Sequence, residues 1–186
     1  MKKIFAIAAL VLGISALAAA QPKAIGGRLG YGPIEVSYEH SVGSPNFFEI
    51  NAGVDLYSLA AGHFGAQVSA LYNFVLAQPS WTSRGDWEFY AGPGLTTGWL
   101  GDTVHKYYEG VHDWEWQQGY MVGIAAQVGL SYTFWFPLNL SVDLRPVLGL
   151  HINAPVSGQL IDTKVGLYNQ GFTWCWIPTL SVRYAF

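Results

Sequence analysis

The chain is poor in charge and almost without cysteine. Only 11% of its 186 residues are charged, and Cys175 is the single cysteine. One cysteine excludes an internal disulfide, so packing and hydrogen bonds must hold the fold together. Basic residues are especially few. The chain has nine Lys and Arg, and without Lys2 and Lys3 there are seven, compared with twelve Asp and Glu. This balance speaks against nucleic acid as a partner.

Long apolar runs are also lacking, except near residue 1. Lys2 and Lys3 precede an uncharged apolar run over residues 4–17, and three alanines at 18–20 then offer a cleavage site before Gln21. This layout is typical of a secretory signal peptide. We therefore expect a signal peptide over residues 1–20 and a single exported domain over 21–186. That domain holds no second apolar run of about 18 residues, so we expect no transmembrane helix in it.

What the chain has instead is alternation of apolar and polar residues. In residues 171–186, every second residue from Phe172 to Phe186 is apolar, and those between are mostly small or polar. Side chains of a strand alternate between its two faces, so one face of this stretch is apolar and the other polar. The pattern recurs seven more times and predicts eight strands, over residues 24–31, 34–40, 47–57, 63–75, 86–97, 118–135, 138–152 and 171–186.

The charged residues avoid the apolar faces of these strands. Nine of those that follow the signal peptide precede the strands or fall in connections. The other ten lie on the polar faces: Arg28, Arg145, Arg183, Glu35, Glu39, Glu49, Asp55, Asp86, Glu88 and Asp143. A Lys or Arg that faces lipid costs roughly 2–4 kcal/mol at mid-bilayer, so lipid around the strands explains this segregation. Strands cross a bilayer only as closed barrels. The sequence thus predicts an all-β fold, an eight-stranded antiparallel up-and-down transmembrane β-barrel.

The connections and aromatic residues fit such a barrel. Aromatic residues gather at strand ends, as interfacial girdles require. Most connections are short or medium, and two long ones, residues 100–117 and 153–170, are expected outside the cell. Three prolines inside strands, Pro93, Pro146 and Pro178, each remove a ladder donor, so we expect bulges or kinks there.

These features resemble the small eight-stranded outer-membrane barrels, the family of the OmpA membrane domain, OmpX and related porin-family proteins. The resemblance rests on the signal peptide, the eight strands and the ending LSVRYAF at residues 180–186. That ending is similar to the signal read by the barrel-assembly machinery, with Tyr184 and Phe186 as its aromatic residues. The resemblance implies a place in the Gram-negative cell envelope, in the outer membrane with both termini periplasmic. It also implies outer-membrane lipid and the assembly machinery as partners.

The charges expected inside the barrel suggest an ion-pair network. We expect three arginines to pair with four carboxylates: Arg28, Arg145 and Arg183 with Glu35, Glu49, Glu88 and Asp143. Such a network could plug the lumen, or it could line a small cation-preferring pore. We favour the plug, because eight strands leave just enough interior for side chains.

Catalysis is the less favoured alternative. The resemblance includes barrel enzymes that modify lipid A through a His-x-Ser or an Asp-Ser pattern, and this chain has neither. His63 and His151 are expected inward at the outer mouth, where Asp55 could join them. Two inward histidines are more often polar filling, and Cys175 is expected to be inert filling as well, so we expect no enzyme and no cofactor.

The first long connection is the best candidate for an interaction surface. Exposed aromatic and acidic residues suit an extracellular ligand or another membrane protein, although they could also fold over the barrel mouth. The residues concerned are Tyr107, Tyr108, His112, Asp113, Trp114, Glu115 and Trp116. Their spacing matches no defined metal site. The function predicted is a structural or interaction role through the two long loops, with an accessory subunit of a larger complex as an alternative.

Overall fold

The computed structural model describes residues 22–108, 111–153, 165–173 and 175–186, which form ten strands and two short helices. The strands are β1 (Pro22–Leu29), β2 (Pro33–Ser41), β3 (Phe47–Asp55), β4 (Ala66–Ala77), β5 (Asp86–Tyr108), β6 (Val111–Thr133), β7 (Asn139–Leu144), β8 (Val147–Asn153), β9 (Val165–Leu167) and β10 (Thr179–Ala185). The helices are α2 (Leu56–Ala60) and α3 (Gln170–Thr173). Neither is long or apolar enough to span a membrane.

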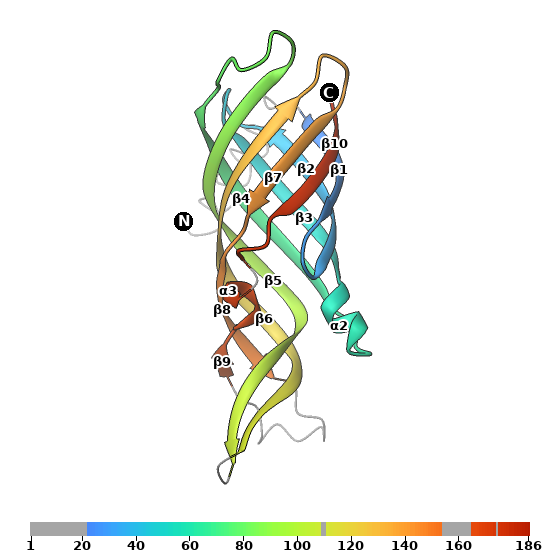
Figure 1. Ribbon diagram of the computed structural model, residues 1–186, viewed down its shortest axis with the longest axis vertical. Coiled ribbons are helices and arrows are strands. Elements are labelled where there is room, and N and C mark those ends of the chain that lie inside the picture. Colours follow the sequence, from blue (N-terminus) through green and yellow to red (C-terminus); the bar gives the residue numbers. More distant parts are fainter. Residues whose placement is uncertain (1–21, 109–110, 154–164, 174) are drawn as a thin grey trace, which may run out of the picture.

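The strands close into an antiparallel barrel with eight strand positions (Figure 1). Each strand from β1 to β6 pairs with the next. β6 then pairs with both β7 and β8, which together fill the seventh position. β10 pairs with β7 on one side and with β1 on the other, so the ring is complete. The prediction of an all-β fold with a closed eight-stranded antiparallel barrel is confirmed.

The barrel has two unlike ends. At the turn end lie the connections 42–46, 78–85 and 134–138 and the last residue of β10 (Figure 1). At the hairpin end lie α2, α3, β9 and the tip of the β5–β6 hairpin, which projects well past the rest of the barrel (Figure 1).

This projecting hairpin replaces a predicted loop. β5 and β6 have 23 residues each and stay paired to Tyr108–Val111. The expectation of a long loop over residues 100–117 is therefore wrong. The segment contains several Val, Thr, Tyr and Trp residues, which favour strands.

Prolines reshape the wall where β7, β8 and β10 meet. The predicted strand over residues 138–152 is broken between Leu144 and Val147, at Pro146, as expected of a proline kink. β10 begins only at Thr179, directly after Pro178, so the predicted strand over 171–178 is wrong: α3 and turns take its place. At Pro93, the β4–β5 ladder is interrupted between the Leu71–Gly94 pair and the Phe74–Ala91 pair.

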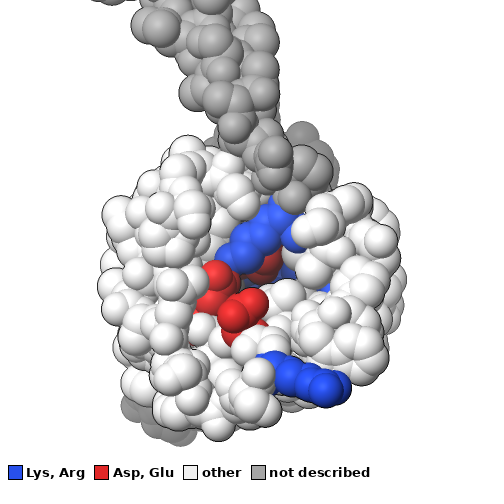
Figure 2. Space-filling view, turned by 90° about the horizontal axis from the view of Figure 1, so that it is seen from above, with Lys and Arg blue, Asp and Glu red and all other residues white. Residues whose placement is uncertain are grey.

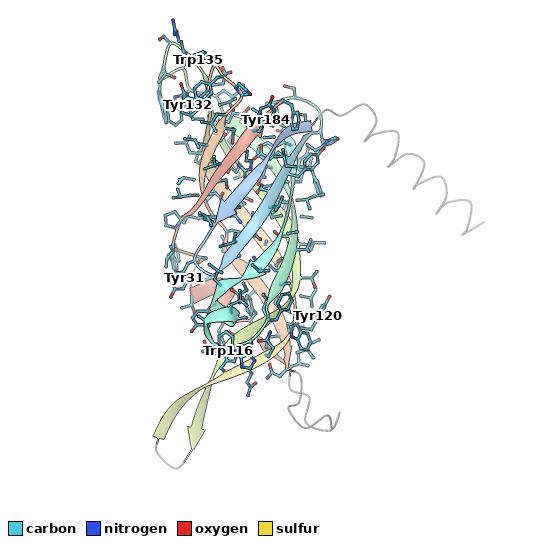
Figure 3. The ribbon with its side chains drawn as sticks, turned by 90° about the vertical axis from the view of Figure 1, so that its right-hand side faces the viewer. Tyr31, Trp116, Tyr120, Tyr132, Trp135 and Tyr184 are labelled. Carbon is cyan, nitrogen blue, oxygen red and sulfur yellow. The ribbon has the colours of Figure 1, made fainter. Side chains whose placement is uncertain are left out.

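The two faces of the wall differ as the alternation predicts. Outward side chains are apolar and exposed, such as Val36 (62%), Leu95 (67%) and Leu180 (59%). Ser37, next to Val36, and Arg183, on the same strand as Leu180, point inward and are at most 1% exposed. Aromatic side chains gather at both ends of the barrel: Figure 3 labels Tyr132, Trp135 and Tyr184 at one end and Tyr31, Trp116 and Tyr120 at the other.

Candidate functional site

The lumen holds a network of paired charges, built by strand alternation. Arg28 on β1 stands directly opposite Glu35 on β2, and its Nη1 donates to Glu35 Oε2 at 2.7 Å. Its Nη2 donates to Asp143, which reaches in from β7. All three side chains are at most 2% exposed. Figure 2, seen from the turn end, shows acidic and basic side chains gathered inside a ring of uncharged residues.

Glu49 on β3 is the hub of this network. One carboxylate oxygen, Oε1, accepts from Arg183 at 3.2 Å and from Arg145 at 3.3 Å. The other, Oε2, accepts from Gln127 at 3.0 Å and from Asn73 at 3.2 Å. Three other strands, β4, β6 and β10, and the β7–β8 connection at Arg145 thus converge on one fully buried carboxylate.

Arg183 links this hub to the turn end. Its Nη1 lies 3.0 Å from Glu39 Oε1, and its Nε and Nη1 donate to Ser37 at 2.9 Å and Ser141 at 2.7 Å. Nearer the turn end, Lys23 pairs with Glu88, and its Nζ lies 4.1 Å from the ring centroid of Phe47. The network therefore continues to that mouth.

The structure brings together the charges expected in the lumen, with one change of partner. Glu35, Glu49 and Asp143 pair with arginines, whereas Glu88 pairs with Lys23. Sequence analysis left Lys23 and Glu39 out of the network. Glu39 carried a usable signal, because it lies on the same polar face as Glu35.

Buried charges of this kind are costly unless each is paired. The penalty is several kcal/mol per ion, and it is offset only by good geometry and further hydrogen bonds. Glu49 and Arg183 have both. Apolar side chains fill other parts of the lumen, with Phe47 and Tyr90 in edge-to-face contact at 5.2 Å and Leu71 fully buried. This packing suits a lumen occupied by side chains.

A small cavity remains between the network and the hairpin end. Its volume is about 100 Å³. It is lined by Arg28 and Arg145 together with Tyr57, Gln67, Tyr168 and Cys175. Cys175 is buried, as expected, and its thiol contacts Phe172 O at 3.0 Å.

Asp102 on β5 anchors α3 beside this cavity. Its carboxylate accepts from the backbone N–H groups of Asn169 at 3.0 Å and Gln170 at 3.2 Å, and from Thr103 at 2.9 Å. Burial raises the pKa of the Asp102 carboxyl above its usual value, although these three donors and His151 favour the charged form. Sequence analysis missed this role, because Asp102 was assigned to a loop.

The two histidines do not meet Asp55 as expected. Asp55 caps α2, accepting from the backbone N–H groups of Tyr57 and Ser58. His63 precedes β4 and is exposed rather than inward. His151 is buried, with its ring nitrogens 2.9 Å from Leu100 O and 2.5 Å from Asn153 Oδ1. The expected His/Asp cluster is not formed.

Trp116 is the one member of the expected loop surface whose side chain is described. It packs at the mouth with its ring over Gly101, where an added Cβ would lie 1.6 Å from the indole. Its ring centroid is 4.9 Å from that of Tyr57 and 6.4 Å from that of His63, which it stacks upon. The side chains of residues 104–115 lie outside the described part, including Tyr107, Tyr108, His112, Asp113, Trp114 and Glu115.

Among the described residues, no group of three or more His, Cys, Asp or Glu is placed to hold a metal ion. Comparisons of the chain with models of known families, with curated proteins and with solved structures find no match. Membership of the family of OmpA- and OmpX-like barrels therefore stays a prediction, supported by the closed eight-stranded antiparallel barrel.

Proposed function

We propose that this protein is an integral outer-membrane β-barrel with a plugged lumen, whose β5–β6 hairpin offers an interaction surface beyond the membrane. The observation that carries the proposal is the segregation of charge from apolar surface. The lumen buries ion pairs, while the outer wall exposes apolar side chains on every barrel strand.

An apolar wall of this extent fits a bilayer. Soluble monomers rarely expose continuous apolar patches larger than a few hundred Å². Here exposed apolar residues follow one another around the ring, for example Leu29, Val36, Ile50, Val68 and Leu95 on β1 to β5. Hydrocarbon around the wall would remove this surface from water, which is favourable at about 25 cal/mol per Å².

The plug is favoured over a pore by how completely the lumen charges are engaged. Arg28 and Arg183 are each 1% exposed and ion-paired to two carboxylates. An aqueous channel would hydrate at least one face of these groups. An eight-stranded barrel also has little interior volume beyond its side chains.

The hairpin supports an interaction role. Beyond the Trp99–Tyr120 pair, the ladder continues from Gly101–Gln118 to Tyr108–Val111. Eight residues of strand extend about 26 Å at roughly 3.3 Å per residue. A paired hairpin is preorganised. Binding a ligand or protein to it therefore costs less conformational entropy of the chain than binding to a flexible loop.

Fractionation of cells that express the full chain tests the membrane assignment. We expect the protein in the outer-membrane fraction, resistant to alkaline carbonate extraction, and with a gel mobility that changes on heating as the barrel unfolds. Recovery in the soluble fraction without aggregation would contradict the proposal.

A further inference from the structure

An apolar groove lies on the outer wall of the barrel, beside α3. Its volume is about 640 Å³, and β5, β6 and β8 form its floor. Pro93, Ala126 and Pro146 line it together with the outward side chains of Leu95, Ile124 and Leu148. Phe172 of α3 lines one side of it and is 60% exposed. The groove therefore faces whatever surrounds the barrel.

The polar cavity in the lumen lies directly behind this groove. Val147 lines both the cavity and the groove. Of two adjacent residues in α3, Gly171 lines the cavity and Phe172 lines the groove. A Cβ on Gly171 would lie 2.8 Å from Val147 Cβ, so α3 rests directly on β8 at this point. Val147, Gly171 and Phe172 thus lie between the apolar groove and the polar cavity.

The wall is also weakest here. The β10–β7 ladder ends at the Thr179–Asp143 pair, and β9 meets β8 only from Leu150 to Ile152. Between these ladders the wall is completed by α3 in place of a strand. Hydrogen bonds to Asp102 and Thr103 hold Asn169 and Gln170 against β5. Gly171 and Phe172 take no part in these bonds.

We propose that the groove and the cavity are the two halves of one binding site for a long-chain fatty acid. The alkyl chain lies in the groove, and the carboxylate reaches the cavity when Gly171 and Phe172 move off Val147. The proposal rests on the proposed function, because a groove on this wall meets hydrocarbon only if the barrel is inserted in a membrane.

The cavity selects this class of ligand by charge. Within the described part of the chain, the Nε–H groups of Arg28 and Arg145 are buried without a hydrogen-bond acceptor. Both side chains line the cavity and are at most 7% exposed. Asp55, the acid in the lining, is already engaged with α2. Both guanidinium groups are ion-paired through their Nη atoms, but each keeps one Nε–H donor for which a charged acceptor such as a carboxylate is the strongest partner.

The cavity also has room for a small head group. Its volume of about 100 Å³ is several times the roughly 10–15 Å³ that one water molecule needs on the same measure. A carboxylate fits this space. A single alkyl chain with a carboxylate is therefore an amphiphile that both halves accept.

Equilibrium binding of radiolabelled palmitic acid to the full chain, folded in a nonionic detergent, tests the site. We expect saturable binding of one palmitate per barrel and much weaker binding of methyl palmitate, which has the chain without the charge. Equal binding of acid and ester, or the absence of saturable binding by a folded barrel, would overturn the proposal.

A pair of matched variants locates the chain. Ala126→Phe fills the groove from outside, and Ala52→Phe adds the same ring to the outer wall of β3, away from the groove. We expect Ala126→Phe to weaken palmitate binding by about tenfold or more, the effect of losing about two buried methylene groups. Ala52→Phe should bind as the wild type does; equal affinities of both variants would place the chain elsewhere and refute the groove.

Cys175 reports the position of the head. As the single cysteine and part of the cavity lining, it needs no engineered label. We expect palmitate, but not its methyl ester, to slow the reaction of Cys175 with a small thiol reagent. If Cys175 does not react even without palmitate, the dissociation constants of palmitate and methyl palmitate test the proposal alone. Because binding is measured in detergent, a folded barrel that inserts into membranes but ignores palmitate refutes this site alone. A chain that binds palmitate but does not fractionate with the outer membrane refutes the proposed function instead.

Discussion

At the scale of single residues, Glu49 has the largest share in holding the lumen together. Two arginines and two side-chain amides converge on its carboxylate, from strands on different sides of the barrel. These contacts join β3 to β4, β6 and β10 through the interior, in addition to the ladders of the wall.

We predict that Glu49→Gln lowers the free energy of unfolding by about 3–5 kcal/mol, the usual cost of removing one partner of a buried ion pair. The amide keeps the shape of the side chain but removes the charge that Arg183 and Arg145 share, which leaves Arg183 with Glu39 and Arg145 with Glu35 as their remaining counter-charges. Urea titration of the protein folded in lipid vesicles measures the effect. As a control, Asp86→Asn at the exposed start of β5 should change stability by less than about 0.5 kcal/mol. Similar values for the two variants would contradict the role of Glu49.

The sequence predicts correctly those side-chain contacts that follow from strand alternation alone. Arg28 and Glu35 stand on adjacent strands joined by a short turn, so their pairing follows from local register. The pairing of Lys23 with Glu88 depends on contacts across the lumen, which the period of a strand does not encode. Asp102 illustrates the same limit, since its partners at 169 and 170 are distant in sequence.

At the scale of elements, α3 is the least supported part of the wall. The Asp102 carboxylate ties its first residue and the preceding one to β5, and the carboxyl has a raised pKa. A group whose pKa is higher in the folded than in the unfolded protein contributes stability at low pH and loses it as the pH rises through the folded pKa.

We therefore predict that the free energy of unfolding falls from the ordinary Asp pKa near 4 up through the raised pKa of Asp102, and that Asp102→Asn removes this part of the pH dependence. The variant also places an N–H₂ group against one backbone N–H donor. Amide hydrogen exchange of Asn169 and Gln170 should therefore be faster than in the wild type. Unchanged exchange and an unchanged pH profile would show that Asp102 does not anchor α3.

The β5–β6 hairpin can be removed without opening the barrel. Replacing residues 104–115 by Asn-Gly leaves Thr103 and Trp116 to close a two-residue turn. We predict an unchanged urea midpoint in vesicles, because the β4–β5 ladder ends at Trp99. Partner capture in a detergent pull-down should be lost. A variant that fails to fold, while the wild type folds under the same conditions, would show that the hairpin belongs to the barrel.

The elements show where the sequence was informative. Five of the eight strand positions, those of β1 to β4 and of β7 with β8, lie where the alternation predicts them, within about three residues at their ends. The pattern failed at 171–178, where the alternation is as clear as in a strand. Pro178 removes a ladder donor, and Gly171 lies in α3, where it packs against Val147 of β8. The hairpin was missed because residues 100–117 were predicted to be a connection, although they contain several Val, Thr, Tyr and Trp residues that favour strands.

At the scale of the whole molecule, the account depends on hydrocarbon around the outer wall. Val36 lies on this wall between Gly27 and Ala52 in the ladders and is 62% exposed. We predict that Val36→Arg lowers the free energy of unfolding in vesicles by about 2–4 kcal/mol near mid-bilayer. Val36→Leu, the matched apolar variant, should fold as the wild type does. Equal stability of all three proteins would mean that this face does not meet lipid.

The central claim is that the barrel is inserted in a membrane with its lumen sealed. Single-channel recording of the folded protein in planar bilayers tests it most directly, with insertion verified in the same preparation by the heat-dependent gel shift. The ion pairs of Glu49, Arg183 and Arg28 predict a baseline without steady openings. Steady, ion-selective openings of the wild-type protein would contradict the plug and favour the small cation-preferring pore.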